Sequence, residues 1–201
     1  MGNTRVLVTG FEPFGGASLN PSQLLVEKLA KENLPGVDLS TVILPVEFDR
    51  AAQLLLSTIK DISPKVVICF GQAEGRSSIT PEKIALNLDD ARIADNSGDA
   101  RKQKAIVVGG ADGYFSTLPL EKMVSAINDA GVPASLSLSA GSFVCNHIFY
   151  QMQHALLGQG IQSGFIHLPL VPEQSEEFPN QPTISIDKML IGAKAVILST
   201  L

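Results

Sequence analysis

Short apolar runs alternate with amphipathic stretches over most of the chain. Runs of strand length, most of them with Val or Ile, lie at residues 5–10, 39–44, 65–70, 133–139 and 165–168. Stretches with helical spacing of apolar positions lie at residues 20–32, 51–59, 123–131, 145–157 and 187–201. Strands that alternate with helices in this way predict a mostly parallel sheet with helices on both faces.

The expected fold class is therefore α/β, a three-layer α/β/α sandwich around a mostly parallel, twisted central sheet. Residues 72–118 break the alternation with polar residues and glycines, and we interpret them as a long functional or mobile loop. No repeat or linker marks a second domain, so we expect a single domain over residues 1–201.

Charge and cysteine content narrow the class of protein. The 201 residues carry 15 basic and 20 acidic side chains, a net charge of −5, which argues against a nucleic-acid binder and against a polybasic membrane patch. No apolar run reaches the ~18 residues of a membrane-spanning helix, and no signal-peptide pattern is seen. Two cysteines cannot form a disulfide framework, so we expect a cytoplasmic protein with reduced thiols.

Cys145 has the sequence setting of a nucleophile. It follows an apolar strand and the small-residue turn of residues 139–142, where a helix is expected to begin. The positive end of a helix dipole and its free N–H groups favour a thiolate and could also bind an oxyanion. The alternative interpretation is a small buried side chain. Cys69, inside the run 65–70, fits that second description better.

A cysteine nucleophile needs a base, and His167 is the best-placed histidine. His147 is two positions from Cys145, on a different side of the helix, and His154 lies more than two turns away. His167 ends a predicted strand, and ligands of open parallel sheets gather at the carboxyl ends of strands. The alternative for His167 is a half-buried structural histidine.

A third group should orient the imidazole. The acidic candidates in the long middle segment are Glu82, Asp89, Asp90 and Asp95. Glu82 lies in the largely apolar stretch 79–87, where it is either a surface charge or retained for a purpose. Spacing alone does not choose between Glu82 and Asp95.

The loop at residues 10–16, Gly-Phe-Glu-Pro-Phe-Gly-Gly, follows the first strand. It matches neither phosphate-binding glycine pattern. Phe11 and Phe14 suit a small, flat, weakly polar ligand, or they plug the core beneath the loop.

Together these segments resemble the pyroglutamyl peptidase I (pyrrolidone-carboxylate peptidase) family of cysteine peptidases, along almost the whole chain and in order. The resemblance rests on residues 10–16, Gly71-Gln72, the segment Thr80–Asn87, Ala91-Arg92-Ile93, the segment Ser139–His147 and the segment Gly164–Pro169. The cysteine and glutamate segments are the most specific. Glu74 and Ala94 depart from the family pattern, as does a short last helix.

The resemblance implies a cytosolic omega peptidase that removes an N-terminal pyroglutamyl residue from peptides through an acyl-enzyme, without metal or other cofactor. It implies Cys145 as nucleophile, His167 as general base and Glu82 as third catalytic residue, with Arg92 supporting the oxyanion. It implies a substrate pocket made by Phe11, Phe14, Asn20, Gln72, Ile93, Phe143 and Val144, with Val46 a weaker addition. Homotetramers or dimers are implied as well. Two alternatives are another cysteine amidohydrolase, of glutaminase type, and a non-catalytic small-molecule binder.

Overall fold

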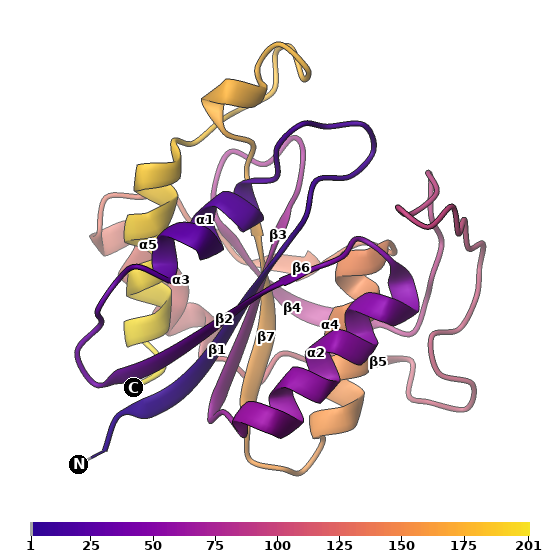
Figure 1. Ribbon diagram of the computed structural model, residues 1–201, viewed down its shortest axis with the longest axis horizontal. Coiled ribbons are helices and arrows are strands. Elements are labelled where there is room, and N and C mark those ends of the chain that lie inside the picture. The colour runs from indigo at the N-terminus through magenta and orange to yellow at the C-terminus, as the bar shows by residue number, and fades with distance from the viewer. Residues whose placement is uncertain (1) are drawn as a thin grey trace.

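A computed structural model describes residues 2–201 and contains one mixed sheet flanked by helices (Figure 1). Its strands are β1 (Thr4–Phe11), β2 (Val37–Leu44), β3 (Val66–Gln72), β4 (Thr80–Leu86), β5 (Gly113–Phe115), β6 (Ser137–Ser139) and β7 (Gln162–Leu168). The strand order is β2-β1-β3-β7-β4-β5, and β6 also pairs with β4. β1, β2, β3 and β7 are parallel to one another, whereas β4 runs antiparallel to both β7 and β5.

The helices form two outer layers. They are α1 (Pro21–Leu29), α2 (Phe48–Ile62), α3 (Leu120–Asp129), α4 (Val144–Leu156) and α5 (Ile186–Leu198), with a short 3-10 helix, η1 (Pro172–Gln174). In Figure 1, α1, α3 and α5 cover one face of the sheet, and α2 and α4 cover the other. The prediction of a three-layer α/β/α sandwich with a mostly parallel sheet is confirmed.

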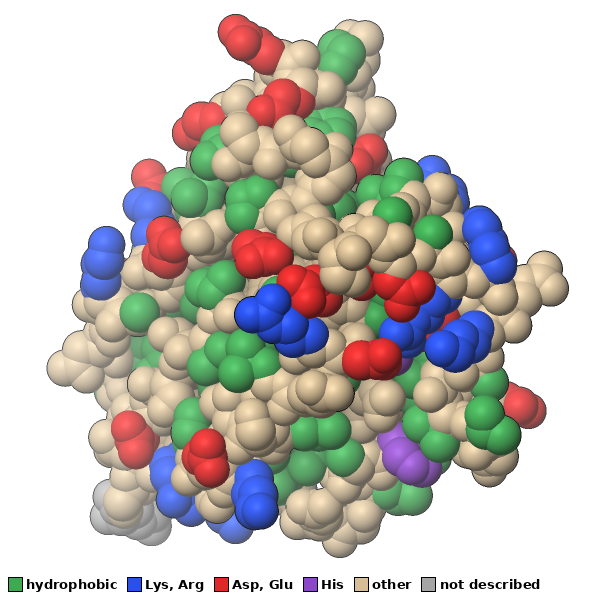
Figure 2. All heavy atoms as spheres, turned by 45° about the vertical axis from the view of Figure 1, so that its right-hand side comes forward, with side chains coloured by type: hydrophobic (Ala, Val, Ile, Leu, Met, Phe, Trp, Pro, Cys, Tyr) green, Lys and Arg blue, Asp and Glu red, His purple; other side chains and the backbone are tan. Residues whose placement is uncertain are grey.

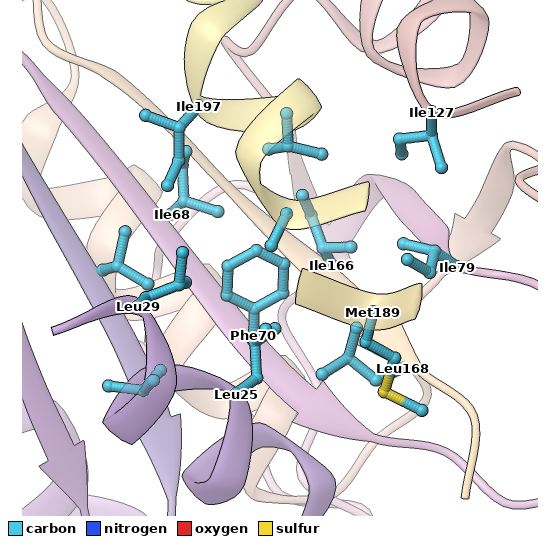
Figure 3. Close-up of a cluster of buried hydrophobic side chains, with 14 of the residues drawn as sticks. Leu25, Leu29, Ile68, Phe70, Ile79, Ile127, Ile166, Leu168, Met189 and Ile197 are labelled. Atoms are coloured by element: carbon cyan, nitrogen blue, oxygen red, sulfur yellow. The ribbon is translucent and has the colours of Figure 1, made fainter. Parts of the chain in front are cut away.

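Each face of the sheet has its own apolar core. Phe70 and Ile166 project from β3 and β7 toward α1 and α5, where they meet Leu25 and Met189 (Figure 3). On the opposite face, Phe165 belongs to the cluster formed with α2 and α4. Burial of such side chains beneath two helical layers stabilises a sheet whose central strands are mostly buried on both faces.

The expectation of a long loop over residues 72–118 is wrong in two places. β4 and β5 lie within it, and β4 joins the sheet directly beside β7. Strand alternation is hidden there because Thr80 and Glu82 are polar yet buried. The predicted strand at 133–139 shortens to β6, which contains only its last three residues.

The first loop is anchored where β1 ends. Asn20 caps α1, its Oδ1 accepting from the backbone N–H of Ser22, and the Ser22 hydroxyl accepts from the N–H of Phe11. Pro21 occupies the first helical position, where a backbone N–H would have no partner within the helix, so the N–H that proline lacks is not missed. The loop that carries Phe14 is thereby held against the carboxyl ends of the central strands.

Candidate active site

Cys145 is the second residue of α4, and Gly71 makes room for it. A β-carbon placed on Gly71 would lie 2.9 Å from Cys145 Sγ and 2.7 Å from the ring of Phe165. The sulfur therefore packs directly over the backbone of β3, near its carboxyl end. Only a residue without a side chain leaves that space.

Strand register brings His167 beside the same position. Gly71 on β3 is the Cα partner of His167 on β7, and Thr80 on β4 is the partner of His167 from the other side. The ring of Phe165, which contacts the Gly71 position, also packs on the imidazole with centroids 4.9 Å apart. The thiol-bearing helix end and the imidazole thus share one rim of the sheet.

Glu82 completes this arrangement. His167 Nδ1 lies 2.8 Å from Glu82 Oε1, and the carboxylate is fully buried. Asp95, the other acidic candidate, instead accepts from the backbone N–H of Phe48 at 3.0 Å and from Ser97 and Asp99 in its own loop. The geometry therefore pairs His167 with Glu82 and gives Asp95 a structural contact.

Sequence reasoning missed Arg76, which lies beside Glu82. Its Nη2 is 3.3 Å from Glu82 Oε1 and 3.1 Å from the Ser137 hydroxyl. A guanidinium compensates part of the cost of burying a carboxylate, although Glu82 Oε2 keeps no partner within residues 2–201. A single arginine in a polar loop gives no pattern from which this contact could have been predicted.

The surroundings of Cys145 act against ionisation of its thiol. Burial, followed by the negative charge of Glu82 and then by Cys69, raises the pKa of Cys145 to about 12. Loss of hydration disfavours the charged form of the thiol and so acts against the helix end, which favours a thiolate. His167, which shares this rim of the sheet, is the candidate base for the thiol proton.

A small, narrow cavity opens beside Cys145. Most of the expected pocket residues line it, together with the weaker candidate Val46. The lining residues are Phe11, Phe14, Asn20, Val46, Gln72, Phe143, Val144 and Cys145. Of the remaining expected residues, Ile93 is exposed and lies near Gly15, and Arg92 is exposed, so neither lines this cavity.

The aromatic wall is supported from behind by a charged cluster. The ring of Phe143 packs against Phe14 at 6.0 Å and edge-on against Phe48 at 5.5 Å. The guanidinium of Arg101 lies 4.5 Å from the Phe48 ring and bonds to Asp49 and to the buried Asp89. These contacts fix the wall residue by packing on its outer side.

His147 belongs to this charged cluster and not to the rim with Cys145. Its Nδ1 lies 2.9 Å from Asp89 Oδ2, and its ring packs edge-on against Phe48. No group of three or more possible metal ligands occurs within residues 2–201. None of the described helices is long and apolar enough to cross a bilayer.

Comparisons with known proteins place the chain in a family. A family model described as pyroglutamyl peptidase matches residues 4–201. The chain belongs to the pyroglutamyl peptidase family. A pyrrolidone-carboxylate peptidase of Vibrio vulnificus (strain CMCP6) is 45% identical over 197 residues, which cover 98% of this chain and 92% of the relative.

Solved structures of the family have the same fold. Pyroglutamyl peptidase I from Bacillus amyloliquefaciens superposes with a TM-score of 0.94 at 37% identity, covering 98% of this chain and 95% of the other. Pyrrolidone carboxyl peptidase from Pyrococcus furiosus gives a TM-score of 0.93 at 38% identity, with 98% of each chain covered. The fold that positions Cys145 and His167 here is thus the family fold.

Proposed function

We propose that this chain is a pyroglutamyl peptidase, which hydrolyses the amide bond after an N-terminal pyroglutamyl residue, with Cys145, His167 and Glu82 as its catalytic residues. The observation that carries the proposal is the joint position of these groups. A thiol packed over Gly71 lies beside the strand partner of that glycine, His167, whose imidazole is held by a buried carboxylate at 2.8 Å. A small cavity lined by aromatic rings and side-chain amides opens next to the sulfur.

The first half of the reaction forms an acyl-enzyme. Since His167 Nδ1 donates to Glu82, its Nε2 is the nitrogen that accepts the thiol proton. The sulfur then forms a bond to the carbonyl carbon, and the carbonyl electron pair moves onto oxygen. N–H groups at the start of α4 bind that oxyanion. The imidazolium gives its proton to the leaving amine as the C–N bond breaks, which leaves a thioester on Cys145.

The second half returns the enzyme to its starting state. His167 Nε2 takes a proton from water, and the resulting hydroxide bonds to the thioester carbon. Collapse of this intermediate breaks the C–S bond, releases pyroglutamate and reprotonates the sulfur. Glu82 stabilises the imidazolium in both halves. The family resemblance assigns support of the oxyanion to Arg92, an exposed side chain that does not line the cavity.

Ring recognition follows from the chemistry of the cavity. A pyroglutamyl residue is a lactam without a free amine. A site that recognises the N-terminal ammonium group of a peptide therefore cannot bind it in that way. Rings of Phe11, Phe14 and Phe143 can sandwich the flat lactam, while amides of Asn20 and Gln72 supply polar contacts. A prolyl ring has no carbonyl and would leave such groups unpaired. The family resemblance adds Ile93 to this pocket; its side chain is exposed and lies near Gly15, outside the cavity.

The test is cleavage of pyroglutamyl, prolyl and alanyl reporter amides by the purified protein, with and without a thiol-blocking reagent. We expect turnover of the pyroglutamyl amide alone, abolished by the reagent and by Cys145→Ala. Cys69→Ala is the matched control, because Cys69 is fully buried against Met152 and does not line the cavity. Turnover by Cys145→Ala at the wild-type rate would refute the nucleophile.

We also propose that the protein is a cytoplasmic homo-oligomer, a tetramer or a dimer, and that it acts on peptides. Both cysteines are free thiols, as in a reducing compartment. Acidic and basic side chains lie interspersed on the face drawn in Figure 2, which fits peptide substrates better than nucleic acid or an anionic membrane. Sedimentation of the purified protein measures the oligomeric state directly.

A further inference from the structure

Gln174 is a fully buried polar side chain that the reaction above does not use. It ends η1 and spans three elements of the fold. Its Oε1 accepts from the backbone N–H of Val171 at 3.1 Å. Its Nε2 donates to the backbone carbonyl of Leu19 at 3.2 Å and to Gln72 Oε1 at 3.0 Å. Gln72, in turn, lines the cavity beside Cys145.

The backbone leaves Gln174 only one orientation. An N–H can only donate and a carbonyl can only accept, so Val171 fixes the position of the Gln174 oxygen and Leu19 fixes that of its nitrogen. The atom of Gln72 that meets this nitrogen must then be its oxygen. The two backbone groups, acting through Gln174, therefore fix the orientation of the Gln72 amide.

With its oxygen bonded to Gln174, Gln72 keeps its amide nitrogen as the group that can donate to a ligand in the cavity. Its Nε2 has no acceptor within residues 2–201, yet it is not among the fully enclosed unpaired atoms. Asn20 is fixed in the same sense, because its Oδ1 accepts twice from Ser22 and its Nδ2 donates to the Glu12 carbonyl, with one N–H left over. Both amides of the cavity thus present N–H groups.

We infer that Gln174 is a positioning residue for substrate specificity: it orients the Gln72 amide so that Nε2 donates to the ring carbonyl of the pyroglutamyl residue. The inference rests on the proposed function and deepens it. A donor held in place before the substrate binds increases the affinity for a lactam, whose carbonyl accepts its hydrogen bond. It decreases the affinity for a prolyl ring, which has no carbonyl and leaves the donor unpaired. Without Gln174 the Gln72 amide can turn either way, and part of this selection is lost.

The experiment compares steady-state kinetics on a pyroglutamyl reporter amide, and competitive inhibition by 2-pyrrolidone, for three variants. Gln174→Met keeps the side-chain length and removes the hydrogen bonds that orient the Gln72 amide. KM and the inhibition constant should therefore rise by about tenfold, while kcat stays within about threefold of wild type. Gln174→Glu should raise both further, because its carboxylate draws the Gln72 N–H away from the cavity. Gln181→Met, the same substitution at an exposed position beyond η1, should match wild type.

A double-mutant cycle with Gln72→Met separates positioning from general loss of stability. If Gln174 acts through Gln72, then Gln174→Met adds less than about twofold to KM in the Gln72→Met background. Thermal unfolding confirms that each variant is folded. If the effects of Gln174→Met and Gln72→Met on KM multiply in the double variant, the inference is overturned. Wild-type KM and inhibition constants in both Gln174 variants would overturn it as well. Failure of the wild-type protein itself to cleave the pyroglutamyl amide would instead overturn the proposed function, and this inference with it.

Discussion

Burial of the Glu82 carboxylate carries an unfavourable desolvation free energy, which its contacts offset in part. One carboxylate oxygen is shared between His167 and Arg76, while the other has no partner within residues 2–201. An unpaired buried oxygen calls for an explanation. The explanation that we propose is the imidazole of His167, whose orientation the carboxylate fixes through the 2.8 Å contact.

Replacement of Glu82 by Gln should separate this role from folding. The amide keeps the shape but cannot stabilise an imidazolium as a carboxylate does, so kcat on a pyroglutamyl reporter should fall by roughly 10²–10⁴-fold. The thermal midpoint should change little, because an ion is removed from a buried site. Steady-state kinetics and thermal unfolding of one preparation measure both. Wild-type kcat in Glu82→Gln would exclude the residue from the reaction.

At this scale the sequence predicts residues that have a local signature. Cys145 stands at a helix start and His167 at a strand end, and both features are readable from their neighbours. Glu82 could be separated from Asp95 only through the family resemblance. Gln174 bonds to Gln72 across 102 positions, and Arg76 reaches Ser137 across 61. Contacts of that range depend on the tertiary fold, which no local pattern encodes.

Among the elements, the junction between α4 and β3 sets the position of the nucleophile. Because Cys145 Sγ occupies the space where Gly71 would carry a side chain, Gly71→Ala should displace it. We expect a loss of kcat and a decrease of about 1–3 kcal/mol in the free energy of unfolding. Gly164→Ala is the matched control: its β-carbon would collide with Ser116 and Leu118, at a distance from the sulfur along β7.

The control should destabilise the protein to a similar extent and leave kcat of the folded enzyme within about twofold of wild type. Denaturant unfolding and active-site-normalised kinetics on both variants provide the comparison. Equal kcat in Gly71→Ala and Gly164→Ala would show that the close contact over β3 has no catalytic consequence.

Asp95 connects the loop at residues 88–104 to the start of α2. Burial alone would raise its pKa, but hydrogen bonds from Ser97 and from the backbone N–H groups of Phe48, Asp99 and Ser97 outweigh burial and lower it. A carboxyl whose folded pKa is lowered adds stability above its unfolded pKa of about 4, and this contribution is lost as pH falls through the folded value.

Asp95→Asn should therefore lower the free energy of unfolding by about 1–3 kcal/mol at pH 7, and the difference from wild type should shrink below about pH 4. Denaturant unfolding at both pH values measures it. Asp90→Asn is the control, since the partly exposed Asp90 pairs only loosely with Lys102 and should change stability by less than about 0.5 kcal/mol. A pH-independent deficit in Asp95→Asn would rule out the ionised form as its source.

Element prediction failed where function altered the pattern. β1, β2, β3, β7 and the five α-helices follow apolar periodicity, and their positions agree with the structure to within a few residues. β4 was missed because its buried face carries Thr80 and Glu82, polar residues that contact His167. A strand with polar side chains on its buried face lacks the apolar alternation by which strands are predicted.

For the whole molecule, we propose a single domain, and cooperative unfolding tests it. The sheet is continuous, and each of its faces is covered by helices from distant parts of the sequence. Far-ultraviolet circular dichroism and the fluorescence of the two tyrosines should therefore report one coincident denaturant transition. Two separated transitions would indicate independently stable parts.

The position of β7 between β3 and β4 also has a consequence during synthesis. β3 leaves the ribosome long before its partner at residues 162–168, and every residue of β3 is buried in the finished fold. A nascent chain that ends short of β7 therefore carries an open apolar edge in the middle of its future sheet. Such edges recruit other chains, so we expect growing copies of this protein to require shielding by chaperones until the seventh strand is inserted.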